Sequence, residues 1–311
     1  MRRFIGVDVG GTSIKMGIVD ENGTVLHRRE IPYKVSEGSP TVMQLIKDNV
    51  RTLISEEGPD AEAFAGIGVS AAGNINSSTG SVAENGGNVP GWSFTEVCSE
   101  LRDEFGLPAT LANDANCAIL GEFWKGAAEG YTDVLGLTLG TGVGGGVITG
   151  GRLLEGSRGY AGEVGHFPTH AGGIHCVCGI DGCFERYAAT SALIRAAEAV
   201  EPLWNNGRDL FAAAEQGNKL ALSIIDDWID EIAYGIAGFV HVFDPQLVLI
   251  GGGVSRQQKL LIEPLREKVI SRIMPDFAEG LEFKSATLGN DAGMVGAVYY
   301  FLSRENRNLE M

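Results

Sequence analysis

Two segments of this chain share one plan, and that repetition limits the folds that the chain can adopt. Residues 3–9, RFIGVDV, predict a strand that ends at the turn Gly10-Gly11-Thr12, and a second strand, IKMGIVD, and a third, TVLHRREIPY, follow. Residues 132–151, TDVLGLTLGTGVGGGVITGG, repeat this order of strand, turn of glycine and threonine, and strand. Because the two turns begin 130 positions apart, we expect two similar lobes with one turn in each.

Both turns are candidates for binding phosphate. A glycine turn brings backbone N–H groups to one spot without side chains in the way, although an ordinary hairpin is the alternative. The second segment also contains G-x-G-x-x-G at 140–145, but a dinucleotide-binding fold requires a helix next, and here Val147-Ile148-Thr149 continues as a strand. A P-loop is excluded because the chain has no Gly-Lys dipeptide.

The segment from Glu163 to Glu185, EVGHFPTHAGGIHCVCGIDGCFE, holds three of the five cysteines and three of the five histidines. The cysteines follow the spacing C-x-C-x4-C, which favours a metal site or a disulfide, with buried small residues as a third interpretation. Three cysteines cannot all pair, whereas a tetrahedral zinc site would take them with one imidazole. The candidate ligands are Cys176, Cys178 and Cys183 with His166, His170 or His175.

Two further stretches carry polar candidates. Asn113 and Asp114 follow the strand predicted at 108–112 and precede a helix that runs to Ala128, so either residue could be its N-cap. Asp114 could equally be a catalytic base, because α/β crevices open at the carboxyl ends of strands. The connection 71–92 is rich in Asn and Gly, which could bind the hydroxyls of a ligand or simply form turns.

The C-terminal part predicts a long core helix and a third glycine turn. Apolar residues recur on one broad face of residues 219–243, which indicates a buried helix. The strand QLVLI then runs into Gly251-Gly252-Gly253, where the absence of side chains lets a flat ring approach the backbone.

Composition excludes several classes of partner. A formal net charge of −16 repels nucleic acids and anionic membranes, but it does not exclude a nucleotide that brings its own magnesium. The charge-free run 134–151 is no membrane span, since eight of its eighteen residues are glycine. No signal peptide is recognised at residues 1–10, and clustered thiols belong to a reducing compartment, so we expect a cytoplasmic protein.

The run E-x-G-H at 163–166, followed by C-x-C-G-x-x-G-C-x-E at 176–185, resembles the signature of the ROK family of sugar kinases and sugar-responsive repressors. The chain also keeps the family's N-x-P-G-W as Asn88 to Trp92, but has Ala72-Gly73 in place of Pro-Gly. The resemblance implies an α/β, two-lobed actin/hexokinase-like (ribonuclease H-like) ATPase fold with duplicated βββαβα lobes and a zinc-bound loop. We expect residues 1–114 with 291–311 to form the N-terminal lobe and residues 115–290 the C-terminal lobe.

The resemblance also implies roles for particular residues. It implies a structural zinc ion held by His166, Cys176, Cys178 and Cys183, with His170 and His175 outside the ligand set. It implies Asp114 as the catalytic base and a sugar site made of Gly73, Asn88, Asn113, Asp114, Glu163, His166 and Glu185. ATP, with magnesium near Asp8, would be bound by Gly10, Gly11, Thr12, Lys15, Gly140, Thr141, Gly142, Gly251, Gly252 and Gly253.

The implied activity is transfer of a phosphoryl group from ATP to the 6-hydroxyl of glucose, as in glycolysis. The sugar-site residues occur across the family's kinases, so N-acetylmannosamine, N-acetylglucosamine and fructose remain alternatives. A non-catalytic sugar sensor is less expected, because the family's repressors carry an N-terminal DNA-binding domain and here the first turn already begins at Gly10. Dimers are usual in the family, so the resemblance implies a homodimer or homotetramer.

Overall fold

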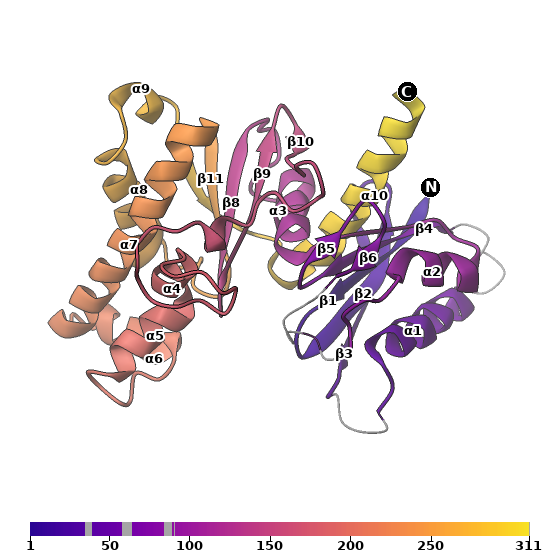
Figure 1. Ribbon diagram of the computed structural model, residues 1–311, viewed down its shortest axis with the longest axis horizontal. Helices are drawn as coiled ribbons and strands as arrows, with labels where there is room; N and C mark the ends of the chain where they lie inside the picture. Colours follow the sequence, from indigo (N-terminus) through magenta and orange to yellow (C-terminus); the bar gives the residue numbers. More distant parts are fainter. Residues whose placement is uncertain (35–38, 58–63, 84–88, 90, 311) are drawn as a thin grey trace. The chain divides into compact units, whose positions relative to one another are not determined.

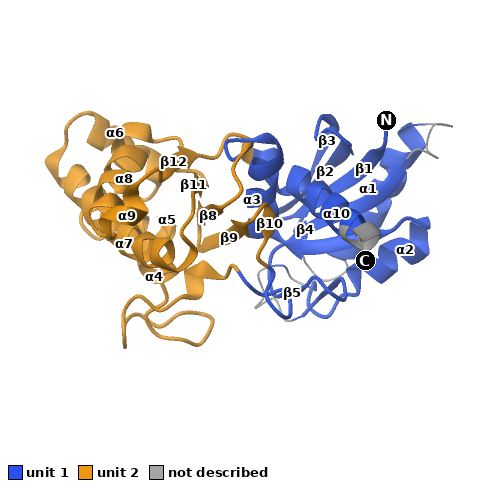
Figure 2. Cartoon of the chain, turned by 90° about the horizontal axis from the view of Figure 1, so that it is seen from above, with its two compact units in different colours: residues 1–129, 155–161, 290–311 blue, residues 130–154, 162–289 orange. Residues whose placement is uncertain are grey.

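The computed structural model describes residues 1–34, 39–57, 64–83, 89 and 91–310, and the chain divides into two compact units. Figure 2 colours unit 1 blue and unit 2 orange. Unit 1 comprises Met1–Glu129, Glu155–Ala161 and Asn290–Met311, and unit 2 comprises Gly130–Leu154 and Gly162–Gly289.

Unit 1 is built on a five-stranded sheet in the order β3-β2-β1-β4-β7 (Figure 1). The first three strands are antiparallel, whereas β1, β4 and β7 run parallel. Its strands are β1 (Arg3–Val9), β2 (Ser13–Asp20), β3 (Val25–Pro32), β4 (Phe64–Ala71) and β7 (Ala109–Asn113), with a small hairpin of β5 (Ile75–Asn76) and β6 (Ser81–Val82). Its helices are α1 (Val42–Glu56), α2 (Val97–Phe105), α3 (Asp114–Lys125) and α10 (Ala292–Glu310).

The two faces of β1 carry different residues. The odd-numbered side chains are fully buried in one core with apolar residues of α1 and α2: Ile5, Val7 and Val9. Phe4 packs on the opposite face against Met294 and Val298 of α10. Because side chains alternate along a strand, Asp8 lies on the same face as Phe4. A Cβ placed on Gly293 of α10 would lie 2.6 Å from the carboxyl carbon of Asp8, so the carboxylate lies directly against the start of that helix.

Unit 2 repeats the strand order of unit 1 with its own five strands, β10-β9-β8-β11-β12. The antiparallel pairs β8/β9 and β9/β10 and the parallel pairs β8/β11 and β11/β12 match those of unit 1. The strands are β8 (Val134–Leu139), β9 (Val143–Thr149), β10 (Arg152–Leu153), β11 (Leu247–Gly251) and β12 (Glu282–Ser285). The predicted duplication of one plan is therefore confirmed.

The helices of unit 2 pack around α7 (Lys219–Phe243), which has the bounds predicted from its apolar periodicity. Trp228, Ile232 and Ile236 are buried in the main core of this unit, whereas Leu222, on the predicted face, is 37% exposed. The remaining helices are α4 (Glu185–Ala188), α5 (Thr190–Glu198), α6 (Gly207–Glu215), α8 (Glu263–Ile270) and α9 (Pro275–Ala278), with short turns at Val164–His166, Gln258–Ile262 and Gly289–Asp291.

The division of the chain differs from the predicted lobe boundary at residue 114, because α3 lies in unit 1. The cause is a close contact of α3 with α10. A Cβ added to Gly296 of α10 would lie 1.7 Å from the carbonyl oxygen of Cys117, and one added to Gly121 of α3 would lie 2.3 Å from the carbonyl oxygen of Ala292. Glycine at both positions lets the two helix backbones touch, which ties α3 to unit 1.

Among the helices that the structure describes, none is long and apolar enough to span a membrane.

Candidate active site

Asp114 occupies the first turn of α3, directly after the end of β7. The capping role belongs to its neighbour: the side-chain oxygen of Asn113 accepts hydrogen bonds from the backbone N–H groups of Ala115 at 2.9 Å and Asn116 at 3.1 Å. One carboxylate oxygen of Asp114 also accepts from the Ala115 N–H at 2.9 Å. Asn113 is therefore the N-cap of α3, and Asp114 adds a second acceptor to one of the N–H groups that Asn113 binds.

The carboxyl ends of β1, β4 and β7 bring Asp8 and Asp114 to one edge of the sheet. Ala71 of β4 pairs with Val9 on one side and with Asn113 on the other. The outer strands are thus separated by two strand spacings, roughly 10 Å. Burial, together with the charges of Asp8 and Asp114, raises the pKa of the Cys117 thiol well above its usual value, so both carboxylates are within electrostatic reach of this one buried group.

Asp8 is a buried carboxylate with few partners. The Ser70 hydroxyl donates a hydrogen bond to it at 2.7 Å, and Lys15 lies opposite it in the register of β1 and β2. Burial raises the pKa of the Asp8 carboxyl, and the Ser70 hydrogen bond and the Lys15 charge only partly oppose that rise. A carboxylate whose charge is disfavoured by burial is suited to a nearby cation.

The first glycine turn is closed by its own backbone and held by Tyr33. The Gly10 N–H donates to the Ser13 carbonyl at 3.0 Å, and the Tyr33 hydroxyl donates to the Gly10 carbonyl at 2.6 Å. The Tyr33 N–H donates to the Thr12 carbonyl at 3.1 Å. Two carbonyl oxygens of the turn are thus occupied. The amide of the next residue in a trans peptide points away from the carbonyl, so the occupied Gly10 carbonyl turns the Gly11 N–H outward.

The second glycine turn and the third lie against one pocket of unit 2. The Gly140 N–H donates to the Gly142 carbonyl at 3.0 Å, which closes the turn after β8. Gly252, directly after β11, has a φ of +97°, and a Cβ on it would lie 2.1 Å from the Leu139 carbonyl oxygen. Only glycine fits so close to that carbonyl. The pocket has a volume of about 420 Å³ and is lined by Leu139, Gly140, Thr141, Thr190, Ser191, Ile194, Arg195, Glu198 and Gly253.

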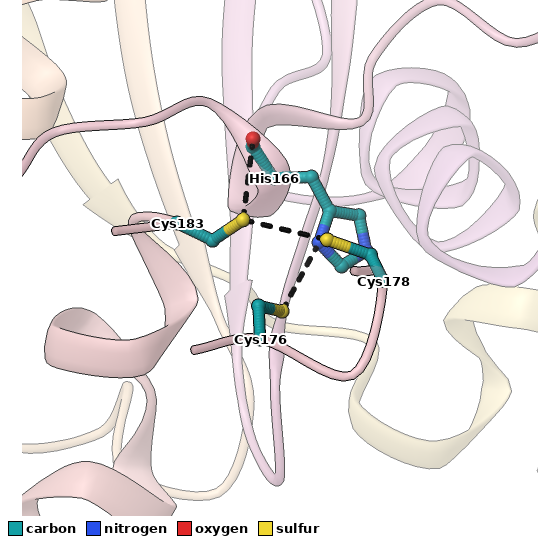
Figure 3. A group of neighbouring side chains, drawn as sticks. All are labelled: His166, Cys176, Cys178 and Cys183. Carbon is teal, nitrogen blue, oxygen red and sulfur yellow. Dashed lines mark hydrogen bonds between the residues drawn. The ribbon is translucent and has the colours of Figure 1, made fainter. Parts of the chain in front are cut away.

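The four predicted zinc ligands lie together in unit 2 (Figure 3). Their donor atoms, from His166, Cys176, Cys178 and Cys183, all lie within 4.8 Å of one another. The Sγ atoms of Cys178 and Cys183 are 3.5 Å apart, and the Cys176 Sγ is 3.8 Å from the His166 Nδ1. Tetrahedral zinc with Zn–S bonds of about 2.3 Å requires donor separations of roughly 3.5–3.8 Å. The donor chemistry of the cluster therefore fits a zinc ion, and these two separations match the spacing that zinc requires.

The other two histidines of the segment have different partners. The His170 ring stacks on Tyr187 with 3.8 Å between ring centroids, and the His175 Nδ1 lies 2.7 Å from the Asp181 carboxylate. Two isolated antiparallel β-bridges close the loop that carries the cysteines. They pair the backbones of Pro168 and Cys183 and of His175 and Asp181. The fold thus keeps His166 in the cluster and holds His170 and His175 elsewhere.

Two carboxylates lie beside the cluster. The Cys176 thiol donates to Glu185 at 3.0 Å, and the same carboxylate oxygen is 3.9 Å from the His166 Nδ1. Burial raises the pKa of the Glu163 carboxyl, and the Glu185 charge adds to the rise, whereas His166 lowers it. The other oxygen of Glu185 is only 2.5 Å from the position that a Cβ on Gly142 would take. Glu185 therefore lies between the cluster of cysteines with His166 and the second glycine turn.

The remaining predicted residues belong to unit 1. Gly73, with a φ of +106°, follows β4 in a bend, and the Lys15 Nζ lies 3.4 Å from the Asn290 side-chain oxygen. Trp92, in the predicted N-x-P-G-W run, is fully buried. Asn88, a predicted sugar ligand, lies outside the described residues.

Sequence reasoning did not find two sets of residues. Ser70, the hydrogen-bond donor to Asp8, could have been noticed as the polar residue near the end of the apolar run FAGIGVS. The pocket residues of α5 match no motif. They could not be found from the sequence, because their place in the pocket depends on how the helix packs against the second glycine turn. They are Thr190, Ser191, Ile194, Arg195 and Glu198.

Comparison with known proteins places these features in a family. Residues 4–304 match the model of the ROK family. A glucokinase of Thermotoga maritima is 37% identical over 309 residues, which cover 95% of this chain and 96% of that protein. A beta-glucoside kinase of Listeria innocua is 31% identical over 312 residues, 98% of this chain and 99% of that protein.

A solved structure is similar over nearly the whole chain. The ROK family glucokinase of Streptomyces griseus, in complex with glucose and AMPPNP, has a TM-score of 0.78 and 32% sequence identity. The match covers 96% of this chain and 98% of that one. The predicted actin/hexokinase-like fold is thereby confirmed.

Proposed function

We propose that this chain, which belongs to the ROK family, is an ATP-dependent hexokinase that phosphorylates the 6-hydroxyl of glucose. The observation that carries the proposal is the position of Asp114 at the carboxyl end of β7, where Asn113 takes over the capping of α3. A carboxylate at such a strand end suits a base for an incoming hydroxyl.

Asp114 would accept the proton of the sugar 6-hydroxyl as that oxygen attacks the γ-phosphorus of ATP. The bond from oxygen to phosphorus forms while the bond from the γ-phosphorus to the ADP oxygen breaks. Such a transfer needs positioning and charge stabilisation more than covalent help from the protein. The proposed machinery is therefore one base, a set of backbone donors and the magnesium that ATP brings.

The phosphate groups of the magnesium complex of ATP would be bound by the glycine turns. In unit 1 these are Gly10, Gly11 and Thr12, with Lys15 as a positive charge and Asp8 near the magnesium that ATP brings. In unit 2, Gly140, Thr141 and Gly142 would bind phosphate, and Gly251, Gly252 and Gly253 would lie under the adenosine. The pocket between the second and third turns supports this assignment.

The sugar hydroxyls would be bound by the following residues, through polar side chains or, at Gly73, through the backbone. In unit 1 these are Gly73, Asn88, Asn113 and Asp114, and in unit 2 they are Glu163, His166 and Glu185. A structural zinc ion would be held by His166, Cys176, Cys178 and Cys183, and it would orient the imidazole. The Nδ1 of His166 faces the cluster, which leaves Nε2 for a sugar hydroxyl.

A kinase for another hexose derivative is the second candidate, supported by the beta-glucoside kinase at 31% identity. The two candidates are separated by an assay that couples ADP release to a panel of sugars: glucose, fructose, N-acetylmannosamine, N-acetylglucosamine and a β-glucoside. Glucose should have the highest kcat/KM. A higher kcat/KM for another sugar of the panel would mean that this sugar, and not glucose, is the preferred substrate.

The proposed enzyme is cytoplasmic, acts in sugar metabolism such as glycolysis, and forms a homodimer or homotetramer. It has no nucleic acid or membrane as a partner, in keeping with its net charge of −16.

A further inference from the structure

The second glycine turn is held by the first two residues of α5. The Ser191 hydroxyl donates to the Thr141 carbonyl at 2.6 Å, and the Ser191 backbone N–H donates to the Gly140 carbonyl at 3.3 Å. The Thr190 hydroxyl donates to the Leu139 carbonyl at 3.1 Å. Three successive carbonyl oxygens of the turn are therefore bound to one helix start.

This pattern decides which way the amides of the turn point. In a trans peptide the carbonyl of one residue and the N–H of the next point in opposite directions. Holding the carbonyls of Gly140 and Thr141 on α5 thus turns the N–H groups of Thr141 and Gly142 away from it. In the part of the chain that the structure describes, neither amide donates a hydrogen bond, whereas the Gly140 N–H closes the turn.

A phosphate group needs this arrangement. Carbonyl oxygens repel phosphate oxygens, and backbone N–H groups attract them. If the carbonyls of Gly140 or Thr141 were free to rotate, each flip would remove a donor from the turn and add an acceptor. The contacts from α5 prevent both changes.

The start of α5 is itself held by the core of unit 2. The indole N–H of Trp228, on α7, donates to the carbonyls of Ala188 and Ala189 at 3.0 and 3.2 Å. Trp228 is 4% exposed, so this anchor is buried. Ala189 is the N-cap of α5 and offers no side-chain cap. Serine and threonine at a helix start commonly cap the helix, but here Thr190 and Ser191 direct their hydroxyls to the turn instead.

The same residues line the pocket of about 420 Å³ beside the turn, together with Ile194, one turn further along α5. The helix start and the glycine turn therefore form one continuous wall of that pocket.

From this geometry we propose that Ser191, with Thr190, is a positioning residue that fixes the amides of the second glycine turn for the phosphate groups of the nucleotide. The proposal rests on the proposed function, because it assumes that a nucleoside triphosphate occupies the pocket. The Ser191 hydroxyl donates to the Thr141 carbonyl and so acts on the turn, not on the nucleoside. Its loss should weaken phosphate binding and leave adenosine binding unchanged.

The test is calorimetric titration of wild type and Ser191→Ala with three probes: AMPPNP, inorganic tripolyphosphate and adenosine. Loss of the hydroxyl should weaken AMPPNP and tripolyphosphate by a similar factor, roughly 5–10-fold for one hydrogen bond, and leave adenosine unaffected. Steady-state kinetics should show a raised KM for ATP with an unchanged KM for the sugar. Ser191→Thr, which keeps a hydroxyl, should restore most of the tripolyphosphate affinity.

Ser271→Ala is the matched control, because the Ser271 hydroxyl also donates to a backbone carbonyl, that of Lys268 at 2.8 Å, in an exposed part of the same unit. It should bind all three probes as wild type does. Equal tripolyphosphate affinity of wild type and Ser191→Ala, or an equal loss for adenosine and tripolyphosphate, overturns the proposal. Thr190→Val is an independent variant in case Ser191→Ala does not fold. It should also weaken AMPPNP and tripolyphosphate binding and leave adenosine binding unchanged.

Different results would contradict the proposed kinase activity and the positioning role of Ser191. If wild type releases ADP with none of the sugars of the panel, the proposed function fails, whatever the variants bind. If wild type phosphorylates a sugar but Ser191→Ala binds tripolyphosphate normally, only the positioning role fails.

Discussion

The Cys176 thiol donates a hydrogen bond to the Glu185 carboxylate, with 3.0 Å between the Sγ and the Oε1. Burial raises the pKa of this thiol to about 12, so it keeps the proton that it donates. The second oxygen of Glu185 faces Gly142 in the second glycine turn. One carboxylate thus connects the metal cluster to the turn that we assign to phosphate.

If Glu185 binds the sugar as proposed, this contact would link zinc binding to sugar binding. Cysteine binds metal as the thiolate, which has no proton to donate. With zinc bound, Glu185 would lose the Cys176 donor and be available to accept a hydrogen bond from a sugar hydroxyl. Zinc content and sugar affinity should therefore change together.

Replacement of the proposed base is the first prediction. Asp114→Asn keeps the size of the side chain and an oxygen that can accept from the Ala115 N–H, but an amide cannot accept a proton in the reaction. We expect kcat to fall by roughly 10²–10⁴, with glucose affinity retained in calorimetry. Asp103→Asn, at an exposed carboxylate whose side chain is 79% exposed, is the control and should behave as wild type. A kcat above about a tenth of wild type would exclude Asp114 as the base.

The second prediction concerns the metal. Protein purified without chelator should contain about one zinc per chain, since one set of four donors is available. Cys178→Ser should lower that content and weaken glucose binding, because His166 and Glu185 would lose the ion that organises them. Cys98→Ser, a free cysteine of α2, should keep the zinc. Metal analysis by mass spectrometry checks both variants, and a zinc-free protein with full activity would refute the role.

The third prediction separates stability from activity at Asp8. Its raised pKa means that the folded protein binds the proton more tightly than the unfolded chain, whose value is near 3.8. The destabilisation by the buried charge is absent below that pH, develops as the pH rises toward the folded-state pKa, and is complete once the pH exceeds the folded-state pKa. Asp8→Asn should therefore unfold at a higher Tm than wild type at pH 7, while its turnover falls.

Thermal unfolding at a series of pH values checks this sign. The difference in Tm should shrink toward zero as the pH approaches the unfolded-state value. A variant that is less stable than wild type at pH 7 would mean that the Ser70 and Lys15 interactions outweigh the desolvation of the carboxylate.

The fourth prediction concerns the contact between the second and third glycine turns. Gly252→Ala places a Cβ 2.1 Å from the Leu139 carbonyl at a φ of +97°, so it should destabilise the fold, by about 1–3 kcal/mol, and raise the KM for ATP. Gly238→Ala, in α7, meets nothing within 4 Å and should leave both quantities close to wild type. Denaturant unfolding and steady-state kinetics measure the pair. Unchanged KM values in Gly252→Ala would separate this turn from nucleotide binding.

Local patterns in the sequence predicted much of the fold. The apolar periodicity predicted α7 with the observed bounds, and the two strand-turn-strand segments predicted the repeated sheet. The spacing of the cysteines predicted a cluster because its members lie close in the chain. The lobe boundary and the role of α5 could not be predicted, since they depend on contacts between distant residues. Gly296 meets Cys117, and Ser191 meets Thr141, only in the folded chain.

The central claim is that the chain transfers a phosphoryl group from ATP to the 6-hydroxyl of glucose. It is tested most directly by incubating the purified protein with ATP, magnesium and glucose and identifying the product by phosphorus-proton correlation NMR. We predict a phosphate coupled to the protons of carbon 6, formed in amounts equal to the ADP released. Absence of a sugar phosphate, or a phosphate on another hydroxyl, would contradict the account.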